Sequence, residues 1–213
     1  MLKLYSYWRS SSAYRVRIAL NLKGVAHEIT PVHLVRDGGE QHQPEFRAMN
    51  PQGLVPLLVD GELQLSQSLA IFDYLEQRHP TPRLLPTEAG PRAQVWSACQ
   101  IIACEIQPLQ NLRVLQHLTG ELGLDETAKV DWARHWITQG LQAFERSIAS
   151  TARSCCFGDQ PSYADCCLVP QIYNAERFNC DLGAMPTLVR ITRSLREREA
   201  FANAHPDSQA DAQ

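Results

Sequence analysis

The sequence predicts an α/β plus all-α fold, in which a small domain of order βαβαββα is followed by an all-helical domain. Three observations support this: a strand–helix–strand pattern at the start, two short strands joined by a tight turn, and purely helical periodicity afterwards. The 213 residues suit one large domain or two small ones. We expect the first domain over 1–80, the helical domain over 88–204 and a disordered tail over 205–213.

The first strand, the first helix and the second strand form a βαβ unit. Leu2–Tyr5 alternates as a half-buried strand does, and Ser10–Ser12 then marks the turn into a helix. Apolar residues share one face of that helix over 13–20, and Gly24 is a natural stop. With a second strand over 26–32, this order predicts a parallel pair joined by a right-handed crossover.

Two further strands complete the predicted sheet. After a short helix at 45–49, the apolar run 54–59 has Pro56 near its start, where we expect a cis peptide bond. An Asp-Gly turn at 60–61 then leads into a strand at 62–65.

Helices account for the rest of the chain. Ser66–Ser68 opens the first of them, and the proline-dense segment 79–91 marks a domain boundary. Apolar spacing and capping residues predict helices at 69–76, 95–109 with a kink at Pro108, 130–148 capped by Asp125, 162–173 opened by a Ser162–Asp165 capping box, and 187–199.

Charge and hydropathy exclude several classes of function. The formal net charge of -3 gives no nucleic-acid or anionic-membrane footprint. Arg9, Arg15, Arg17 and Lys23, around the first helix, suggest at most a small anionic ligand. No apolar run approaches the roughly 20 residues that span a bilayer, and the first residues lack a signal-peptide core. We therefore expect a soluble, cytoplasmic protein with no nucleic-acid or membrane partner.

The cysteines and histidines predict no metal site. The seven cysteines are an odd count, include two adjacent pairs and contain no C-x-x-C, so neither a disulfide framework nor a zinc ribbon fits. We interpret them as small apolar residues in a reducing compartment. The histidines form no H-E-x-x-H motif.

Five segments, in the same order, resemble those of the zeta-class glutathione transferases, the maleylacetoacetate isomerase family. Residues 9–20 are similar to the signature S-S-C-x-W-R-V-R-I-A-L, although Ser12 and Tyr14 replace its cysteine and tryptophan. The other segments are N-P-x-x-x-V-P at 50–56, Q-S-L-A-I at 67–71, and the stretches 107–112 and 174–178. The resemblance covers nearly the whole chain and implies a thioredoxin-like fold for the first domain.

The resemblance implies that glutathione is the cofactor and that Ser10 activates its thiol. Serines at a helix start can serve simply as N-caps, but the same N–H groups and the helix dipole also attract a thiolate. Only the thiolate is a good nucleophile, so Ser10, supported by Ser11, is expected to stabilise it. Tyr5 and Tyr7 are rivals, because some classes of glutathione transferase use a tyrosine near the N-terminus.

Other groups of glutathione need their own partners. The backbone of Val55 suits the cysteinyl part, Gln67 and Ser68 the γ-glutamyl carboxylate, and Gln41 the glycyl end. Taken alone, Gln67–Ser68 is an ordinary cap and Val55 an ordinary strand start. The implied glutathione contacts are Ser10, Ser11, Ser12, Ala13, Tyr14, Arg15, Gln41, Val55, Gln67, Ser68, Gln107, Asn111, Leu112 and Arg113.

The implied reaction is the cis–trans isomerisation of maleylacetoacetate to fumarylacetoacetate in aromatic amino acid catabolism, by reversible thiolate addition to the double bond. Arginine binds carboxylate bidentately, so Arg9, Arg113 and Arg177 are candidate clamps for a dicarboxylic substrate. Each could instead form a surface salt bridge; Arg9 and Arg177 are the stronger candidates because they lie inside the resembling segments, and for Arg113 the two alternatives are equal. Ser10, Ser11 and Arg9 are the expected catalytic residues.

Three alternatives stay open. They are a maleylpyruvate isomerase, a general glutathione transferase or α-haloacid dehalogenase, and a non-catalytic glutathione transferase-like module. The last is disfavoured because Ser10, Ser11, Gln67 and Ser68 are all present. The resemblance also implies a homodimer.

Overall fold

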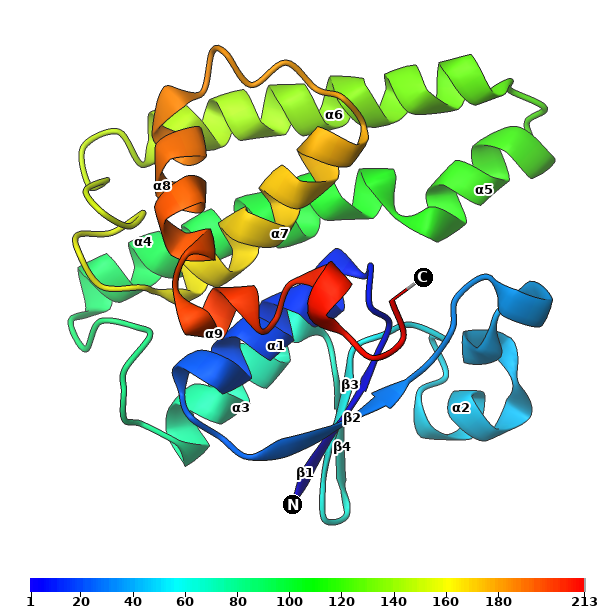
Figure 1. Cartoon of the computed structure of the whole chain (residues 1–213), viewed down its shortest axis with the longest axis horizontal. Helices are drawn as coiled ribbons and strands as arrows, with labels where there is room; N and C mark the ends of the chain where they lie inside the picture. Colours follow the sequence, from blue (N-terminus) through cyan, green and yellow to red (C-terminus); the bar gives the residue numbers. More distant parts are fainter. Residues whose placement is uncertain (213) are drawn as a thin grey trace. The chain divides into compact units, whose positions relative to one another are not determined.

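The computed structural model describes residues 1–212, which form two compact units (Figure 1). The first unit comprises Met1–Arg83 together with the end of the chain from Glu197, and the second comprises Leu84–Arg196. The predicted division had placed everything from 88 to 204 in the helical domain. The structure instead assigns the last residues of that range to the first unit.

A four-stranded mixed sheet forms the centre of the first unit. Its strands are β1 (Leu2–Ser6), β2 (His27–Pro31), β3 (Leu57–Asp60) and β4 (Leu63–Ser66). They lie in the order β2-β1-β3-β4, with β1 parallel to β2 and β3 antiparallel to both of its neighbours. The predicted βαβ unit and Asp-Gly hairpin are therefore confirmed.

The register of the strands places four connections at one edge of the sheet. Ser6, at the end of β1, pairs with Pro31 at the end of β2, while Tyr5 pairs with Leu57 at the start of β3. Leu57 also pairs with Ser66, the last residue of β4. The segments that follow β1, β2 and β4 and the segment that precedes β3 consequently leave the sheet on the same side.

Helices cover both faces of this sheet. They are α1 (Ser11–Leu22), α2 (Pro44–Met49), α3 (Ser68–Arg78) and α9 (Glu199–Ala202), with short 3-10 turns η1 (Arg36–Gly38), η2 (Glu40–His42) and η5 (Pro206–Ser208). In Figure 1, α1 and α3 lie together on one side of the strands and α2 lies on the other.

Helix α1 is buried on nearly every side, and the basic residues of this region are buried with it, except Arg9, which is only partly buried. Arg15 and Arg17 are each 1% exposed, and Lys23 is also buried. The Lys23 Nζ lies 2.8 Å from the Glu76 carboxylate and donates hydrogen bonds to two backbone carbonyls of the 79–82 segment. A buried cation must be paired to offset its desolvation, so the pairing of Lys23 stabilises the fold, and all three cations lie inside the protein rather than on its surface.

The second unit is helical throughout, as predicted. Its elements are α4 (Ala89–Gln100), the π-helical turn η3 (Ile101–Ile106), the 3-10 turn η4 (Gln107–Gln110), α5 (Leu112–Gly120), α6 (Glu126–Ser147), α7 (Tyr163–Arg177) and α8 (Pro186–Arg196). Asp125 caps α6 by accepting the Ala128 N–H at 2.8 Å. The Ser162–Asp165 capping box opens α7.

Two predicted helices differ from the structure. The helix expected over 95–109 does not merely kink at Pro108: it widens into a π-helical turn, tightens into η4 and ends at Asn111. Ile106 lies so close to Gly140 of α6 that a Cβ there would clash, so tertiary packing fixes this path. The helix expected over 187–199 ends at Arg196, and α9 follows as a separate turn.

The end of the chain is folded, in contrast to the predicted disordered tail over 205–213. Residues 205–212 include η5, and the Asp211 carboxylate accepts the N–H of Trp8 at 3.0 Å. Besides local hydrogen bonds, this segment binds Trp8 at the other end of the sequence, a contact that local composition does not indicate. Residue 213 lies outside the described residues.

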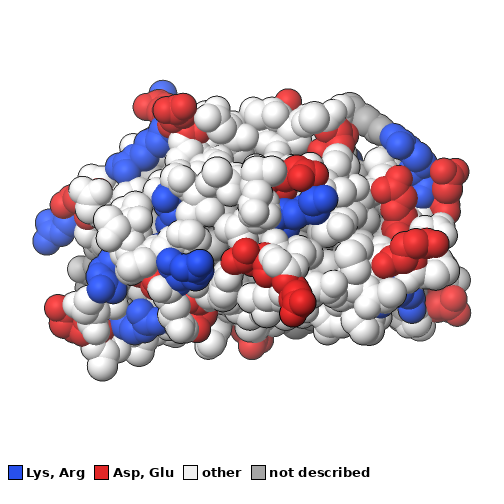
Figure 2. Space-filling view, turned by 90° about the horizontal axis from the view of Figure 1, so that it is seen from below, with Lys and Arg blue, Asp and Glu red and all other residues white. Residues whose placement is uncertain are grey.

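Surface charge and helix hydropathy add two negative findings. On the face drawn in Figure 2, acidic and basic side chains are interspersed and neither sign forms a broad continuous field. Among the described residues, no helix is both long enough and apolar enough to cross a membrane.

Most of the cysteines are part of the core. Cys104 is exposed and Cys180 half-buried, whereas the buried thiols are those of Cys99, Cys155, Cys156, Cys166 and Cys167. Burial raises the pKa of the Cys156 thiol well above its usual value, and the neighbouring Asp165 carboxylate adds to the shift. Such a thiol is not a nucleophile at neutral pH.

Candidate active site

Ser10 caps α1, and no acceptor within residues 1–212 takes its hydroxyl proton. Its Oγ accepts the N–H of Ala13 at 3.2 Å, and its own N–H donates to the Tyr7 carbonyl at 2.9 Å. A hydroxyl that accepts one hydrogen bond still has its O–H to donate. Helix geometry also leaves the N–H groups of Ser11 and Ser12 without intrahelical acceptors. The start of α1 therefore presents several donors suited to an anion.

Ala13 and Tyr14, two further predicted contacts, lie inside the first turns of α1. The side chains of Ala13 and Tyr14 are buried, at 0% and 1% exposure. Their N–H groups donate to the side-chain and main-chain oxygens of Ser10. Both residues therefore serve the packing and capping of α1, and their contacts with glutathione stay predictions.

The two rival tyrosines pack into the core of the first unit. Tyr7 is 5% exposed and lies edge-on to His33, with ring centroids 5.1 Å apart. Tyr5 lies edge-on to Phe46, with centroids 6.0 Å apart. Ser10 is more accessible than Tyr7, so this packing favours the serine as the group that meets a thiol.

The segment before β3 presents its backbone at the same edge of the sheet. The Val55–Pro56 peptide bond is cis, as predicted. Within the described residues, no hydrogen bond takes the backbone N–H or C=O of Val55. The buried Asn50 shapes this loop, because its Nδ2 donates to the Leu54 carbonyl at 2.7 Å and its Oδ1 accepts the Gln52 N–H at 3.3 Å. The sequence does not predict this role, because Asn50 enters there only as part of the N-P-x-x-x-V-P segment.

The start of α3 carries a strained residue followed by a polarised hydroxyl. Gln67 has a φ of 71°, which is uncommon for any residue other than glycine, and its Nε2 donates to Gln52 Oε1 at 2.8 Å. Ser68 Oγ accepts a hydrogen bond from the buried Arg15 Nη1 at 3.2 Å. The Arg15 guanidinium thus lies beside Ser68, and its charge favours the Ser68 hydroxyl as a donor. A contact of Arg15 with glutathione stays a prediction.

Gln41, predicted to contact the glycyl end of glutathione, is buried in the loop after β2. Its side chain is 6% exposed, and its Nε2 donates to the Leu34 carbonyl at 3.2 Å and lies 3.1 Å from His42 Nε2. The amide thus holds the loop after β2 together rather than extending from it. Arg9 is only partly buried, and its guanidinium lies 5.1 Å from the centre of the Trp8 ring.

In the second unit, four of the predicted residues fall within one short segment. Gln107 begins η4, and Asn111 caps α5 by accepting the Arg113 N–H at 3.2 Å. Leu112 is partly buried and the Arg113 side chain is exposed. Two contacts fix the path of this segment: Trp132 Nε1 donates to the Leu109 carbonyl, and Gln110 Nε2 donates to Gln171 Oε1, each at 2.8 Å.

Arg177 is the last residue of α7. Its Nη1 donates to Asn174 Oδ1 at 3.3 Å, and its guanidinium lies 5.9 Å from the ring of Tyr173 and 5.8 Å from that of Phe178. The Arg177 side chain is exposed. Among the described residues, no group of three or more His, Cys, Asp or Glu side chains could hold a metal ion.

Known proteins with similar sequences are isomerases. The family profile "Glutathione S-transferase, N-terminal domain" matches residues 4–83. A probable maleylacetoacetate isomerase of Vibrio cholerae is 52% identical to this chain, over 98% of this chain and 97% of its own length.

Solved structures give the same result. The holo structure of a maleylpyruvate isomerase, described as a bacterial zeta-class glutathione S-transferase, has a TM-score of 0.96 and 42% identity and covers 99% of this chain and 100% of its own. A maleylacetoacetate isomerase of Anaeromyxobacter dehalogenans, with glutathione bound in its active site, has a TM-score of 0.89 and 43% identity, covering 100% and 98%. With this identity over nearly its whole length, the chain belongs to the zeta-class glutathione transferases, the maleylacetoacetate isomerase family.

Proposed function

We propose that this protein is a glutathione-dependent cis–trans isomerase that converts maleylacetoacetate to fumarylacetoacetate. The observation that carries the proposal is the N-cap of α1, where Ser10 keeps a free O–H donor beside unpaired N–H groups. A relative named as a probable maleylacetoacetate isomerase is identical to this chain at 52% of the aligned residues.

The residues present fit glutathione. The register of the sheet places the start of α1, the free backbone of Val55 and the Gln67–Ser68 pair at one edge. These groups match a thiolate, a peptide segment and a carboxylate, in that order. Arg15, buried behind Ser68, adds a positive charge on the carboxylate side.

Bound glutathione would supply the thiolate that adds reversibly to the cis double bond, which lets that bond rotate before the thiol is released. A thiol with a pKa near about 8.5 is mostly protonated at pH 7. Donation from the Ser10 O–H and the first-turn N–H groups lowers that pKa by stabilising the charged form. The dipole of α1 acts in the same direction.

Arginines are the proposed partners of the dicarboxylic substrate. Arg9 extends from the loop that leads to Ser10, while Arg113 and Arg177 are exposed on the second unit. A guanidinium pairs with a carboxylate through two hydrogen bonds, and its charge also stabilises negative charge that develops on the substrate carbonyl oxygen.

Turnover of both candidate acids, with and without glutathione, tests the proposal. We expect maleylacetoacetate to be isomerised only when glutathione is present, with no net consumption of glutathione. Faster conversion of maleylpyruvate would favour the second candidate function, which the structural similarity to a maleylpyruvate isomerase supports. If neither acid is converted while glutathione conjugates or haloacid products form, the isomerase assignment fails.

We also propose that the protein is a cytoplasmic homodimer. The dimer rests on family resemblance, and the compartment rests on the odd number of cysteines in the sequence and its lack of a disulfide-framework pattern, which suit a reducing environment. Light scattering should give about twice the 24.0 kDa of one chain. A mass of one chain at micromolar concentration would contradict the dimer.

A further inference from the structure

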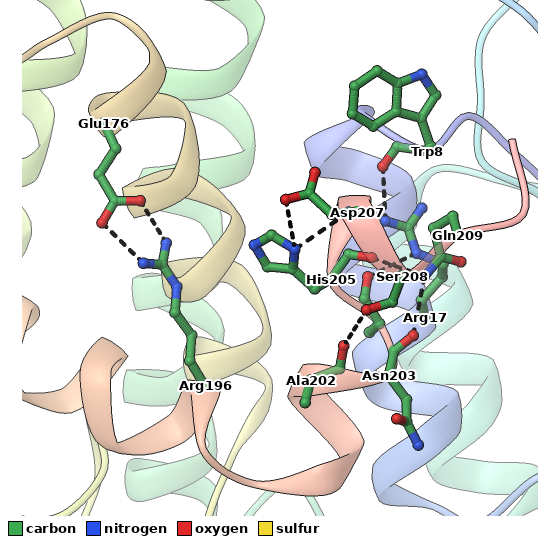
Figure 3. Close-up of polar contacts among 11 residues, drawn as sticks. Trp8, Arg17, Glu176, Arg196, Ala202, Asn203, His205, Asp207, Ser208 and Gln209 are labelled. Atoms are coloured by element: carbon green, nitrogen blue, oxygen red, sulfur yellow. Dashed lines mark hydrogen bonds and ion pairs between the residues drawn. The ribbon is translucent and has the colours of Figure 1, made fainter. Parts of the chain in front are cut away.

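The last residues of the first unit form a C-terminal strap, which we define as residues 197–212. Figure 3 shows this strap beside α1. Asn21 Nδ2 donates to the Ala200 carbonyl at 2.9 Å, and Arg17 Nε donates to the Ala204 carbonyl at 3.1 Å. The proposed chemistry uses none of these residues.

Arg17 joins the strap to the loop that precedes Ser10. Beyond its bond to the strap, its Nη1 donates to Ser6 Oγ at 3.0 Å and to the Tyr7 carbonyl at 3.3 Å. Its Nη2 donates to the Trp8 carbonyl at 2.9 Å. The buried Arg17 guanidinium therefore binds both the strap and the segment that leads to Ser10.

Asp211 binds the second backbone polar group of Trp8, its N–H. Its Oδ2 accepts the Trp8 N–H at 3.0 Å, so both backbone polar groups of Trp8 are bound by side chains from outside the loop. The Tyr7 carbonyl in turn accepts the Ser10 N–H, which closes the turn between Trp8 and the N-cap. Ala212 packs on the apolar cluster that contains Tyr7 and Trp8.

We propose that Asp211 is a positioning residue for Ser10, acting through the Trp8 backbone. This inference rests on the proposed function, because it concerns the donor that lowers the pKa of the bound thiol. A donor must meet the thiolate within a few tenths of an ångström to stabilise it, and a misplacement of about 1 Å can cost up to a hundredfold in rate. Asp211 binds the Tyr7–Trp8 peptide unit through its N–H, and the carbonyl of the same unit accepts the N–H of Ser10.

The test compares three substitutions on the strap in the full chain. Asp211→Ala removes the acceptor, Asp211→Asn keeps an acceptor oxygen without the charge, and Asp207→Ala is the matched control. The Asp207 side chain is 75% exposed, and its carboxylate forms only a surface pair with His205 at 3.7 Å. The readouts are kcat/KM against pH and the ultraviolet absorbance of the bound glutathione thiolate against pH.

We expect Asp211→Ala to lower kcat/KM at pH 7 by about tenfold and to move the thiolate titration to higher pH. Asp211→Asn should restore most of the native profile, and Asp207→Ala should match the native protein. Thermal unfolding, measured in parallel, identifies any variant that is not folded at the assay temperature.

Two results would overturn the inference. One is an Asp211→Ala profile identical to that of Asp207→Ala. The other is an Asp211→Asn protein as impaired as Asp211→Ala, which would assign the effect to charge rather than to the hydrogen bond. Ser10→Ala separates this from the proposed function: if it leaves the thiolate titration unchanged, the assignment of Ser10 fails and the positioning role fails with it.

Discussion

Replacing Ser10 by alanine is expected to lower kcat/KM for the isomerisation about a hundredfold, the loss typical when one donor to a developing anion is removed. The reason is that the Ser10 O–H is free to donate while its Oγ caps α1. Without that donor the pKa of the bound thiol should return toward about 8.5, so the rising limb of kcat/KM against pH should move to higher pH.

Two further substitutions separate the hydroxyl from the cap. Ser10→Gly removes the hydroxyl but weakens capping by only a few tenths of a kcal/mol, whereas alanine loses about 1 kcal/mol of helix stability. We expect glycine and alanine to be equally inactive. Ser10→Thr keeps both the donor and the cap and should recover most of the rate. If alanine and glycine both keep more than half of the native kcat/KM, another donor, such as Ser11, activates the thiol.

The sheet could be predicted because its signals are local. Strand alternation, the Asp-Gly turn and the X-Pro bond at Val55 each depend on neighbouring residues, and the structure has all three. The burial of Arg15 and Arg17 could not be predicted in this way. Their partners Ser68 and Ala204 lie 53 and 187 positions away in the sequence. Without knowledge of such partners, an arginine is expected on the surface.

The sequence predicts which residues lie at the candidate site better than it predicts where their side chains point. Ser10 lies at the helix start and Ser68 at the start of α3, as the motifs indicate. Gln41 turns inward because the amide satisfies the Leu34 carbonyl of its own loop. Asn50 was missed for the same reason, since its function is to bind backbone rather than ligand. Whether the remaining residues contact glutathione stays a prediction.

In the second unit, the path around Pro108 depends on a contact that no local pattern encodes. Proline removes one helical hydrogen bond, which indicates a kink but not its form. The π-helical turn that precedes it places Ile106 against Gly140, a residue of a different helix. The folded C-terminal strap is a similar case, because Asp211 binds a residue 203 positions earlier.

Replacing Asp165 by alanine is expected to destabilise the protein by about 4 kcal/mol, a large part of the stability of a typical domain. The fully buried carboxylate accepts the N–H of Cys156 and the N–H and Oγ–H of Ser162, each at 2.8 Å. Alanine would leave two buried N–H groups unpaired, at a cost of about 1–3 kcal/mol each. Urea unfolding measures the loss. Asp159→Ala is the matched control, because that exposed carboxylate binds Ser154 in the same way and should contribute little.

The stability contributed by Asp165 should also depend on pH in a direction opposite to that of most carboxylates. Burial raises its pKa above the usual value, and the hydrogen bonds donated to it do not outweigh that effect. The folded state therefore holds the proton more tightly than the unfolded state does. The contribution is complete below the unfolded pKa of about 3.9 and is lost as pH rises through the folded pKa. Relative to Asp165→Asn, which does not titrate, the native protein should lose stability over this range. A constant difference in unfolding free energy would show that the carboxylate is ionised in both states, stabilised by its three donors.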